Sequence, residues 1–183
     1  MIDMTVPRRY AKALLTLGKG DGNYKAYGEG LQGFALLLER EPELKDALLN
    51  PIYGREDRHK LLLRMIEVLQ MPPLVGNLLK LLFDKHRLGA VAGVSQAYQQ
   101  LVDELEKVSR AKVKAAIPLD EGIQKRLRQT LEKLTGTTVI MDVEEDPGII
   151  GGVLARVGDL VLDGSVRTQL FSLRESLIKG EVL

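Results

Sequence analysis

An α+β fold is predicted for this 183-residue sequence, with an N-terminal six-helix bundle followed by a small α+β domain. Up to about Ser109, apolar residues recur only at the three- and four-residue spacing of helices. Beyond that point, apolar and polar residues alternate as they do in strands. Residues 146–159 also hold four glycines and one proline between short apolar segments, which indicates an unusual backbone path. We therefore expect two domains, at residues 1–108 and 109–183.

Six helices are expected in the N-terminal domain. Thr5 and Pro7 mark the start of the first, because proline fits the first turn, where its missing N–H is not needed. Gly18 to Gly20 is expected to end this helix, and Asp21 to cap the next one. Tyr10, Ala13, Leu14 and Leu17 are expected to fall on one face of the first helix, at three- and four-residue spacing. The other five helices are expected over residues 24–38, 42–50, 55–70, 72–83 and 88–109.

The fifth helix is apolar almost all the way round. It carries Leu78, Leu79, Leu81, Leu82 and Phe83 within six residues. A helix of this kind is typically buried on all sides. The alternative is that one face stays open for a partner helix.

The C-terminal domain is expected to contain three or four strands and two helices. Strands are predicted over residues 112–117, 137–143, 152–157 and 160–162, the last two joined by a tight turn at Gly158-Asp159. Asp120 is expected to cap a helix that Gly136 closes. Ser165 is expected to cap a last helix, which holds Leu170, Leu173 and Leu177.

Composition favours protein partners. The chain has 26 basic and 25 acidic residues, whereas non-specific nucleic-acid binders carry a marked basic excess. With no cysteine, disulfides, thiolate nucleophiles and cysteine-ligated zinc are excluded. The N-terminus does not have the pattern of a secretory signal, and no apolar run is long enough to cross a membrane. Membrane contact is therefore expected only through a partner.

Catalytic and ligand-binding patterns are weak. The glycine run lacks the lysine of a phosphate-binding loop, and the acids of residues 144–146 before it would repel phosphate. Gly148 to Gly151 matches the GXXG loop of KH domains only superficially, since its two central residues are isoleucines. His59 and His86 are too far apart for a metal-ligand motif. We expect no enzyme activity, no cofactor and no metal site.

Three stretches together resemble the delta subunit of F-type ATP synthases, called OSCP in mitochondria. Residues 9–14 read Arg-Tyr-Ala-Lys-Ala-Leu, similar to the opening of that family, and Arg87-Leu88 is similar to its short R-L motif. The most specific likeness is the order and spacing of a C-terminal set. This set comprises Gly148, Gly151, Gly152, Gly158, Asp159, Asp163, Gly164, Ser165 and Arg167. The resemblance implies that the glycine run is structural.

The resemblance implies a non-catalytic stator subunit, which links the catalytic head to the peripheral stalk and so couples proton-driven rotation to ATP synthesis. In that family the N-terminal domain binds the N-terminal segment of an α subunit, and the C-terminal domain holds the end of the membrane-anchored b subunits. The implied α-binding groove lies between the first and fifth helices, at Tyr10, Ala13, Asn77 and Leu81. The implied location is the cytoplasmic face of a bacterial inner membrane, with no nucleic-acid partner.

From the residues themselves, Tyr10, Ala13 and Leu81 are equally compatible with an ordinary core, and the resemblance is what favours an interface. Two other functions stay open at this point. One is an RNA-binding adaptor that uses the Gly148 to Gly151 loop, although the chain lacks a basic patch. The other is a general helical adaptor for an unknown peptide.

Overall fold

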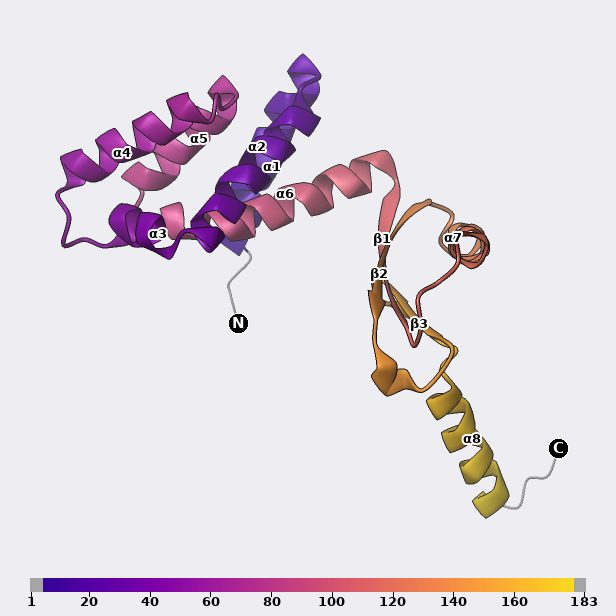
Figure 1. Ribbon diagram of the computed structural model, residues 1–183. Coiled ribbons are helices and arrows are strands. Elements are labelled where there is room, and N and C mark those ends of the chain that lie inside the picture. The colour runs from indigo at the N-terminus through magenta and orange to yellow at the C-terminus, as the bar shows by residue number, and fades with distance from the viewer. Residues whose placement is uncertain (1–4, 180–183) are drawn as a thin grey trace. The chain divides into compact units, whose positions relative to one another are not determined.

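A computed structural model describes residues 5–179 of the chain and confirms the α+β class, with eight α-helices and a four-stranded sheet within those residues (Figure 1). The chain forms two compact units, Met1–Asp103 (unit 1) and Glu104–Leu183 (unit 2). This division falls in the last turn of a helix, slightly before the expected 108/109 boundary.

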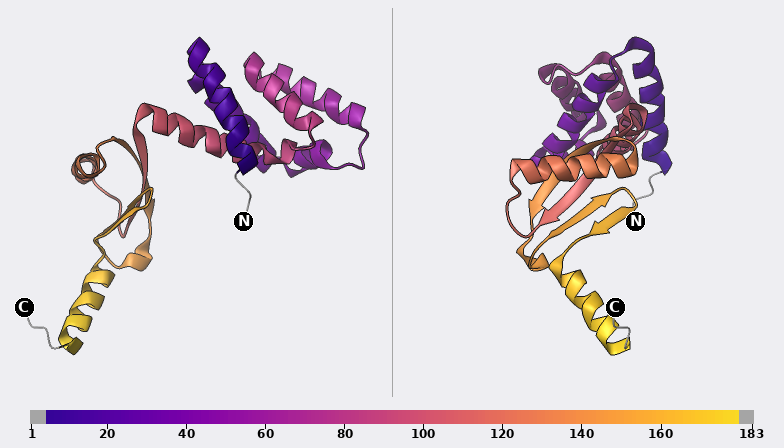
Figure 2. Two further views of the ribbon diagram at one scale, coloured as in Figure 1. Left: turned by 180° about the vertical axis from the view of Figure 1, so that it is seen from behind. Right: turned by 90° about the vertical axis from the view of Figure 1, so that its right-hand side faces the viewer.

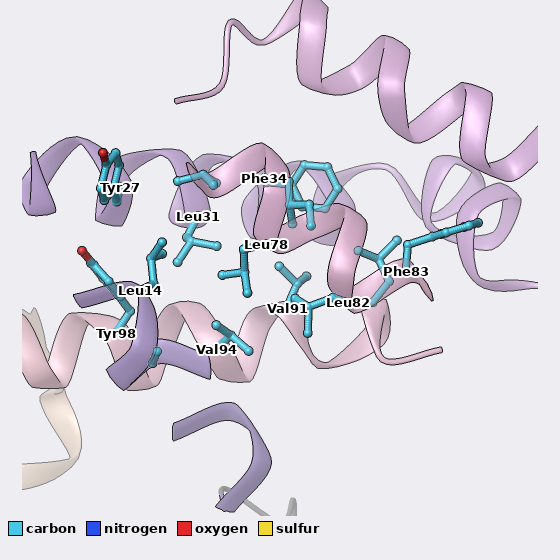
Figure 3. Close-up of a cluster of buried hydrophobic side chains, with 14 of the residues drawn as sticks. Leu14, Tyr27, Leu31, Phe34, Leu78, Leu82, Phe83, Val91, Val94 and Tyr98 are labelled. Atoms are coloured by element: carbon cyan, nitrogen blue, oxygen red, sulfur yellow. The ribbon is translucent and has the colours of Figure 1, made fainter. Parts of the chain in front are cut away.

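Unit 1 is built from helices that share one apolar core. They are α1 (Thr5–Asp21), α2 (Tyr24–Arg40), α3 (Pro42–Leu49), α4 (Arg55–Val68), α5 (Pro73–Asp84), the short 3-10 helix η1 (Leu88–Ala90) and α6 (Val91–Glu106). Figure 3 shows the centre of the core, where side chains from α1, α2, α5 and α6 meet. Its largest fully buried members are Tyr98 and Phe34.

The start of unit 1 corrects two expectations. The first helix continues through the stretch from Gly18 to Gly20, which was expected to end it, and ends at Asp21. Gly18 is buried where α2 passes closely, since a Cβ there would lie 3.0 Å from the Cα of Tyr24. Asp21 does not cap α2, whose first turn has no side-chain cap. Its carboxylate instead accepts hydrogen bonds from the N–H of Asn23 and the hydroxyl of Tyr27, and these bonds lower the pKa of Asp21.

Unit 2 centres on a sheet of strand order β2-β1-β3-β4. The strands are β1 (Val108–Ala115), β2 (Thr138–Glu145), β3 (Val153–Val157) and β4 (Leu160–Asp163), with the short 3-10 helix η2 (Pro147–Ile149) between β2 and β3. β1 pairs in parallel with β2 and antiparallel with β3, and β3 pairs antiparallel with β4. The helix α7 (Glu121–Thr135) connects the parallel pair and packs on one face of the sheet, where Leu131, Val113 and Val139 are buried (Figure 1).

The junction between helix and strand lies earlier than expected. The sixth helix was predicted to reach residue 109 and the first strand to begin at residue 112, but α6 ends at Glu106 and β1 starts at Val108. Lys107 between them has φ +53°, a left-handed conformation that stops the helix in one residue. The expected bounds of α7 agree with the structure, since Asp120 caps its start and Gly136, at φ +68°, ends it.

The last helix, α8 (Val166–Lys179), leaves the end of the sheet and extends away from it (Figures 1 and 2). None of its side chains from Val166 to Leu177 is buried. Among the described residues, no other element packs extensively against it. Within residues 5–179, most of the apolar surface of α8 is therefore left exposed.

Candidate docking surfaces

The predicted α-binding residues lie on two helices that contact each other, α1 and α5. Ala13 and Leu17 share one face of α1, and Asn77 and Leu81 share one face of α5, since residues four apart lie one above the other. All four side chains are exposed, Leu17 at 55% and Leu81 at 44%. Together with half-buried Tyr10 they make up what we call the α1–α5 surface.

The buried face of α1 is not the same as the face that the spacing of Tyr10, Ala13, Leu14 and Leu17 marks. It is formed by Ala11, Leu14, Leu15 and Gly18, so Ala13 and Leu17 point to solvent. The spacing of these four residues is as helical as that of the predicted set, and the sequence therefore offered two faces to choose from. The burial of Leu15 decides between them.

The fifth helix is not buried on all sides. Leu78, Leu79, Leu82 and Phe83 are buried, whereas Leu81 lies on the open side. Gly76 allows α4 to approach on the closed side, since a Cβ there would lie 3.0 Å from the Cγ2 of Ile66. The interpretation of complete burial is therefore wrong for this helix, because α1 and α4 leave one strip uncovered.

Two of the short sequence motifs meet at Tyr10. The Nη1 of Arg87 donates a hydrogen bond of 3.3 Å to the Tyr10 hydroxyl, and the guanidinium of Arg9 lies 5.9 Å from the centroid of its ring. Leu88, the next residue after Arg87, is buried in the core of unit 1. The arginine is thus anchored by its neighbour while it orients the tyrosine, and both cations border the α1–α5 surface.

The glycine run of unit 2 makes one sharp turn. The N–H of Gly151 donates to the carbonyl of Ile149 at 2.7 Å, and Ile150 between them has φ +67°, which is unusual for a β-branched residue. At Gly152 a side chain is impossible, because φ is +82° and a Cβ would lie 2.2 Å from the carbonyl oxygen of Gly164. The run therefore packs backbone against backbone.

The carboxylate of Asp146 stabilises the start of the same run by hydrogen bonds. Asp146 accepts hydrogen bonds from the Nζ of Lys114 at 2.9 Å and from the N–H of Gly148 at 3.0 Å. The bond from Lys114, followed by that from Gly148, lowers the pKa of Asp146. With the N–H groups of Gly148 and Gly151 used inside the chain, the loop is a poor phosphate cradle. It joins two strands rather than the two helices of a KH loop.

The Asp-Gly-Ser motif fixes the start of α8. Asp163 accepts from the N–H of Ser165 at 2.9 Å and from the hydroxyl of Thr168 at 2.7 Å, and the Ser165 hydroxyl accepts from the N–H of Thr168. These bonds, with that from the Ser165 N–H the largest cause, lower the pKa of Asp163. Thr168 was missed by the sequence reasoning, because its hydroxyl acts on the cap through Asp163, five residues earlier in the chain.

The other members of the predicted motif have simpler positions. Gly158, at φ +57°, and Asp159 form the turn between β3 and β4. The N–H of Gly164 donates to the carbonyl of Val153, which ties the end of β4 to β3. Arg167 is exposed on the first turn of α8.

Catalytic or metal chemistry finds little support in the described part of the chain. His59 packs beside the ring of Phe83, with 5.5 Å between the ring centroids, and His86 follows α5. Residues 5–179 contain no group of three or more histidine or acidic side chains placed to hold a metal ion. Nor is any helix in that range long and apolar enough to cross a membrane.

Comparisons with known proteins give one consistent result. The family model for the ATP synthase delta (OSCP) subunit matches residues 6–177. An "ATP synthase subunit delta" from Desulfosudis oleivorans is 45% identical over 181 residues, which cover 99% of each chain. Another from Desulfatibacillum aliphaticivorans is 42% identical over 183 residues and covers 100% of both. A chain in the cryo-EM structure of the Toxoplasma gondii mitochondrial ATP synthase hexamer has the same fold, with a TM-score of 0.72, 22% identity, and coverage of 95% of this chain and 98% of that one.

Proposed function

The chain belongs to the ATP synthase delta (OSCP) subunit family, and from this premise we propose that it holds two partners through two separate surfaces. As a member of this family it is a non-catalytic stator subunit, which links the catalytic head to the peripheral stalk and so couples proton-driven rotation to ATP synthesis. In our proposal, unit 1 acts as a six-helix bundle that binds the N-terminal segment of an α subunit. Unit 2 holds the ends of the b subunits, at the cytoplasmic face of a bacterial inner membrane.

One observation carries the assignment of unit 1: Leu81 is exposed at 44% on a helix whose Leu78, Leu79, Leu82 and Phe83 are buried. Leu17 stands exposed on the neighbouring helix, so two leucines and Ala13 are available to an incoming amphipathic helix. Covering the exposed part of each leucine contributes about 1 kcal/mol. Tyr10, held by Arg87, offers a ring to the partner while its hydroxyl keeps a polar contact.

The test is a calorimetric titration of the full chain with a synthetic peptide of the N-terminus of the α subunit from the same organism. We expect sub-micromolar binding at a one-to-one ratio, and at least about a hundredfold loss for Leu81→Asp, because a carboxylate would be buried without a partner. Leu36→Asp is the matched control, since Leu36 is exposed to nearly the same extent, 43%, on α2.

The control variant should bind like the unchanged chain. Equal weakening by both variants would mean that the α1–α5 surface is not the specific site. No heat with the unchanged chain at tens of micromolar peptide would contradict the proposed role of unit 1.

A further inference from the structure

We infer that α8 docks side by side on a partner helix that carries an apolar heptad stripe with acidic residues along one flank. The inference rests on the proposed role of unit 2 and deepens it, because it states which helix of unit 2 meets the b subunits and which chemistry they must present. Three observations on α8 lead to it.

The first is an exposed stripe, Val166, Leu170, Leu173 and Leu177, which we call the α8 stripe. Its spacings of four, three and four residues are those of the a and d positions of a coiled coil, so all four side chains lie along one line of the helix. Their exposures are 38%, 56%, 55% and 67%. A line of four apolar side chains that are each more than a third exposed is unusual for a folded domain.

The second observation is that hydrogen bonds fix the N-terminal end of α8 to the rest of unit 2. The N–H of Val166 donates to the carbonyl of Gly151 at 2.9 Å, and Ser165, which precedes it, is buried. Asp163 and Thr168 close the first turn by their hydrogen bond. The direction of the helix relative to the sheet is thus set before any partner binds, which lowers the entropy lost on docking.

The third observation is the charge beside the stripe. Arg167 and Arg174 stand seven residues apart and flank the α8 stripe on the same side, at the positions that contact the flank of a partner helix. The other flank carries Gln169 and Ser176, and Glu175 points away from the stripe. Within the described residues neither arginine has a hydrogen bond or an ion pair.

Together these observations specify the occupant. The stripe needs a helix with its own heptad leucines or similar residues, and the two arginines need Asp or Glu one heptad apart on the facing flank. A second copy of α8 does not fit as well. In an antiparallel pair the two basic flanks would face each other, and in a parallel pair the arginines would face Gln169 and Ser176, which carry no negative charge.

The experiment titrates the full chain with the soluble, membrane-free portion of the b subunit from the same organism. We expect Leu170→Asp to weaken binding about a hundredfold and the double variant Arg167→Glu/Arg174→Glu about tenfold or more. Binding of the unchanged chain should weaken as salt rises, and the double arginine variant should lose most of that salt dependence.

The matched control is Arg126→Glu/Lys133→Glu, which reverses two exposed cations, also seven residues apart, on α7. It changes the net charge equally and should leave binding unchanged. Circular dichroism should show that all three variants keep the secondary structure of the unchanged chain, because every altered residue is exposed.

The outcomes separate the two proposals. If the unchanged chain binds the b portion and the α8 variants bind equally well, the inference about α8 is overturned while the role of unit 2 stands. If the unchanged chain does not bind at all, the role of unit 2 fails and the inference fails with it. If sedimentation shows a dimer of the chain that Leu170→Asp dissociates, the occupant is a second copy, which also overturns the inference.

Discussion

In our proposal each of the two units binds a partner helix, but the surfaces that they present to it differ. Unit 1 has an extensive apolar core, and its exposed apolar side chains include Leu17 on α1 and Leu81 on α5. Unit 2 has a core of six buried residues, and its last helix, α8, adds nothing to it. Leu81 is thus an exposed side chain on a helix that is otherwise packed into a large core, whereas the α8 stripe lies on a helix that contributes no buried residue to the core of its unit. This difference is why we propose that a partner adds more to the packing of unit 2 than to that of unit 1.

The largest expected effect tests whether the backbone turn of unit 2 tolerates a side chain. Gly152→Ala should destabilise unit 2 by more than about 4 kcal/mol, because the left-handed φ and the 2.2 Å approach to Gly164 leave no room for a Cβ. Hydrogen exchange should show loss of protection in β3, β4 and α8 only. Gly33→Ala is the control, since a Cβ on this α2 glycine would meet nothing within 4 Å. Protection in β3 and β4 that survives Gly152→Ala would contradict the backbone packing described above.

A second test compares the two cores directly. Leu79 in unit 1 and Leu131 in unit 2 are both fully buried, and replacement of either by alanine should cost about 3 kcal/mol. Scanning calorimetry should show that each variant lowers the melting temperature of its own unit alone. A common shift of the whole transition in both variants would mean that the units do not unfold separately.

Alkaline pH should act on unit 1 through Tyr98. Its hydroxyl donates to the carbonyl of Tyr24 at 2.8 Å, and burial raises the pKa of Tyr98 from 10.0 to about 12. The folded state then keeps a proton that the unfolded state releases, so the free energy of unfolding should fall as pH rises from 10 towards 12. Tyr98→Phe should cost about 1.5 kcal/mol at neutral pH and should flatten that fall. Urea unfolding at several pH values measures the cost of the substitution and the fall with pH. If the free energy of unfolding of Tyr98→Phe falls as steeply with pH as that of the unchanged chain, another group causes the fall.

The smallest expected effect on stability concerns the first turn of α8. Ser165→Ala removes the hydroxyl that accepts from the N–H of Thr168, and it should cost about 1 kcal/mol. Hydrogen exchange should be faster in the first turn of α8 and unchanged in α7. Because hydrogen bonds lower the pKa of Asp163, the carboxylate adds stability at neutral pH that is lost below its ordinary pKa of 3.8, as pH falls through the folded value. If the amides of α8 were equally protected from exchange at pH 7 in the unchanged chain and in Ser165→Ala, the capping role of Ser165 would be contradicted.

Much of the fold could be predicted because local signals agree with tertiary structure. Prolines at residues 42 and 73 lie at helix starts, and Asp120 and Gly136 bound α7 as expected. The alternation of Val113 and Ala115 indicated a strand that the structure contains. These features depend on residues close together in the sequence, and they can therefore be predicted from the sequence alone.

What could not be predicted depends on which elements meet. The sequence makes α5 apolar all round, and only the arrangement of α1 and α4 decides that Leu81 is the residue left exposed. No local signal marks Lys107 for its positive φ, so the expected helix over residues 88–109 includes the first two residues of β1. Thr168 supports α8 only because Asp163 folds back towards it.

The central claim is that the two surfaces work independently, and one crossed titration tests it most directly. The α-subunit peptide and the soluble b portion are each titrated into the unchanged chain, Leu81→Asp and Leu170→Asp. The account predicts that Leu81→Asp loses only the α peptide and Leu170→Asp only the b portion. Loss of both partners in one variant, with its circular dichroism unchanged, would contradict the claim.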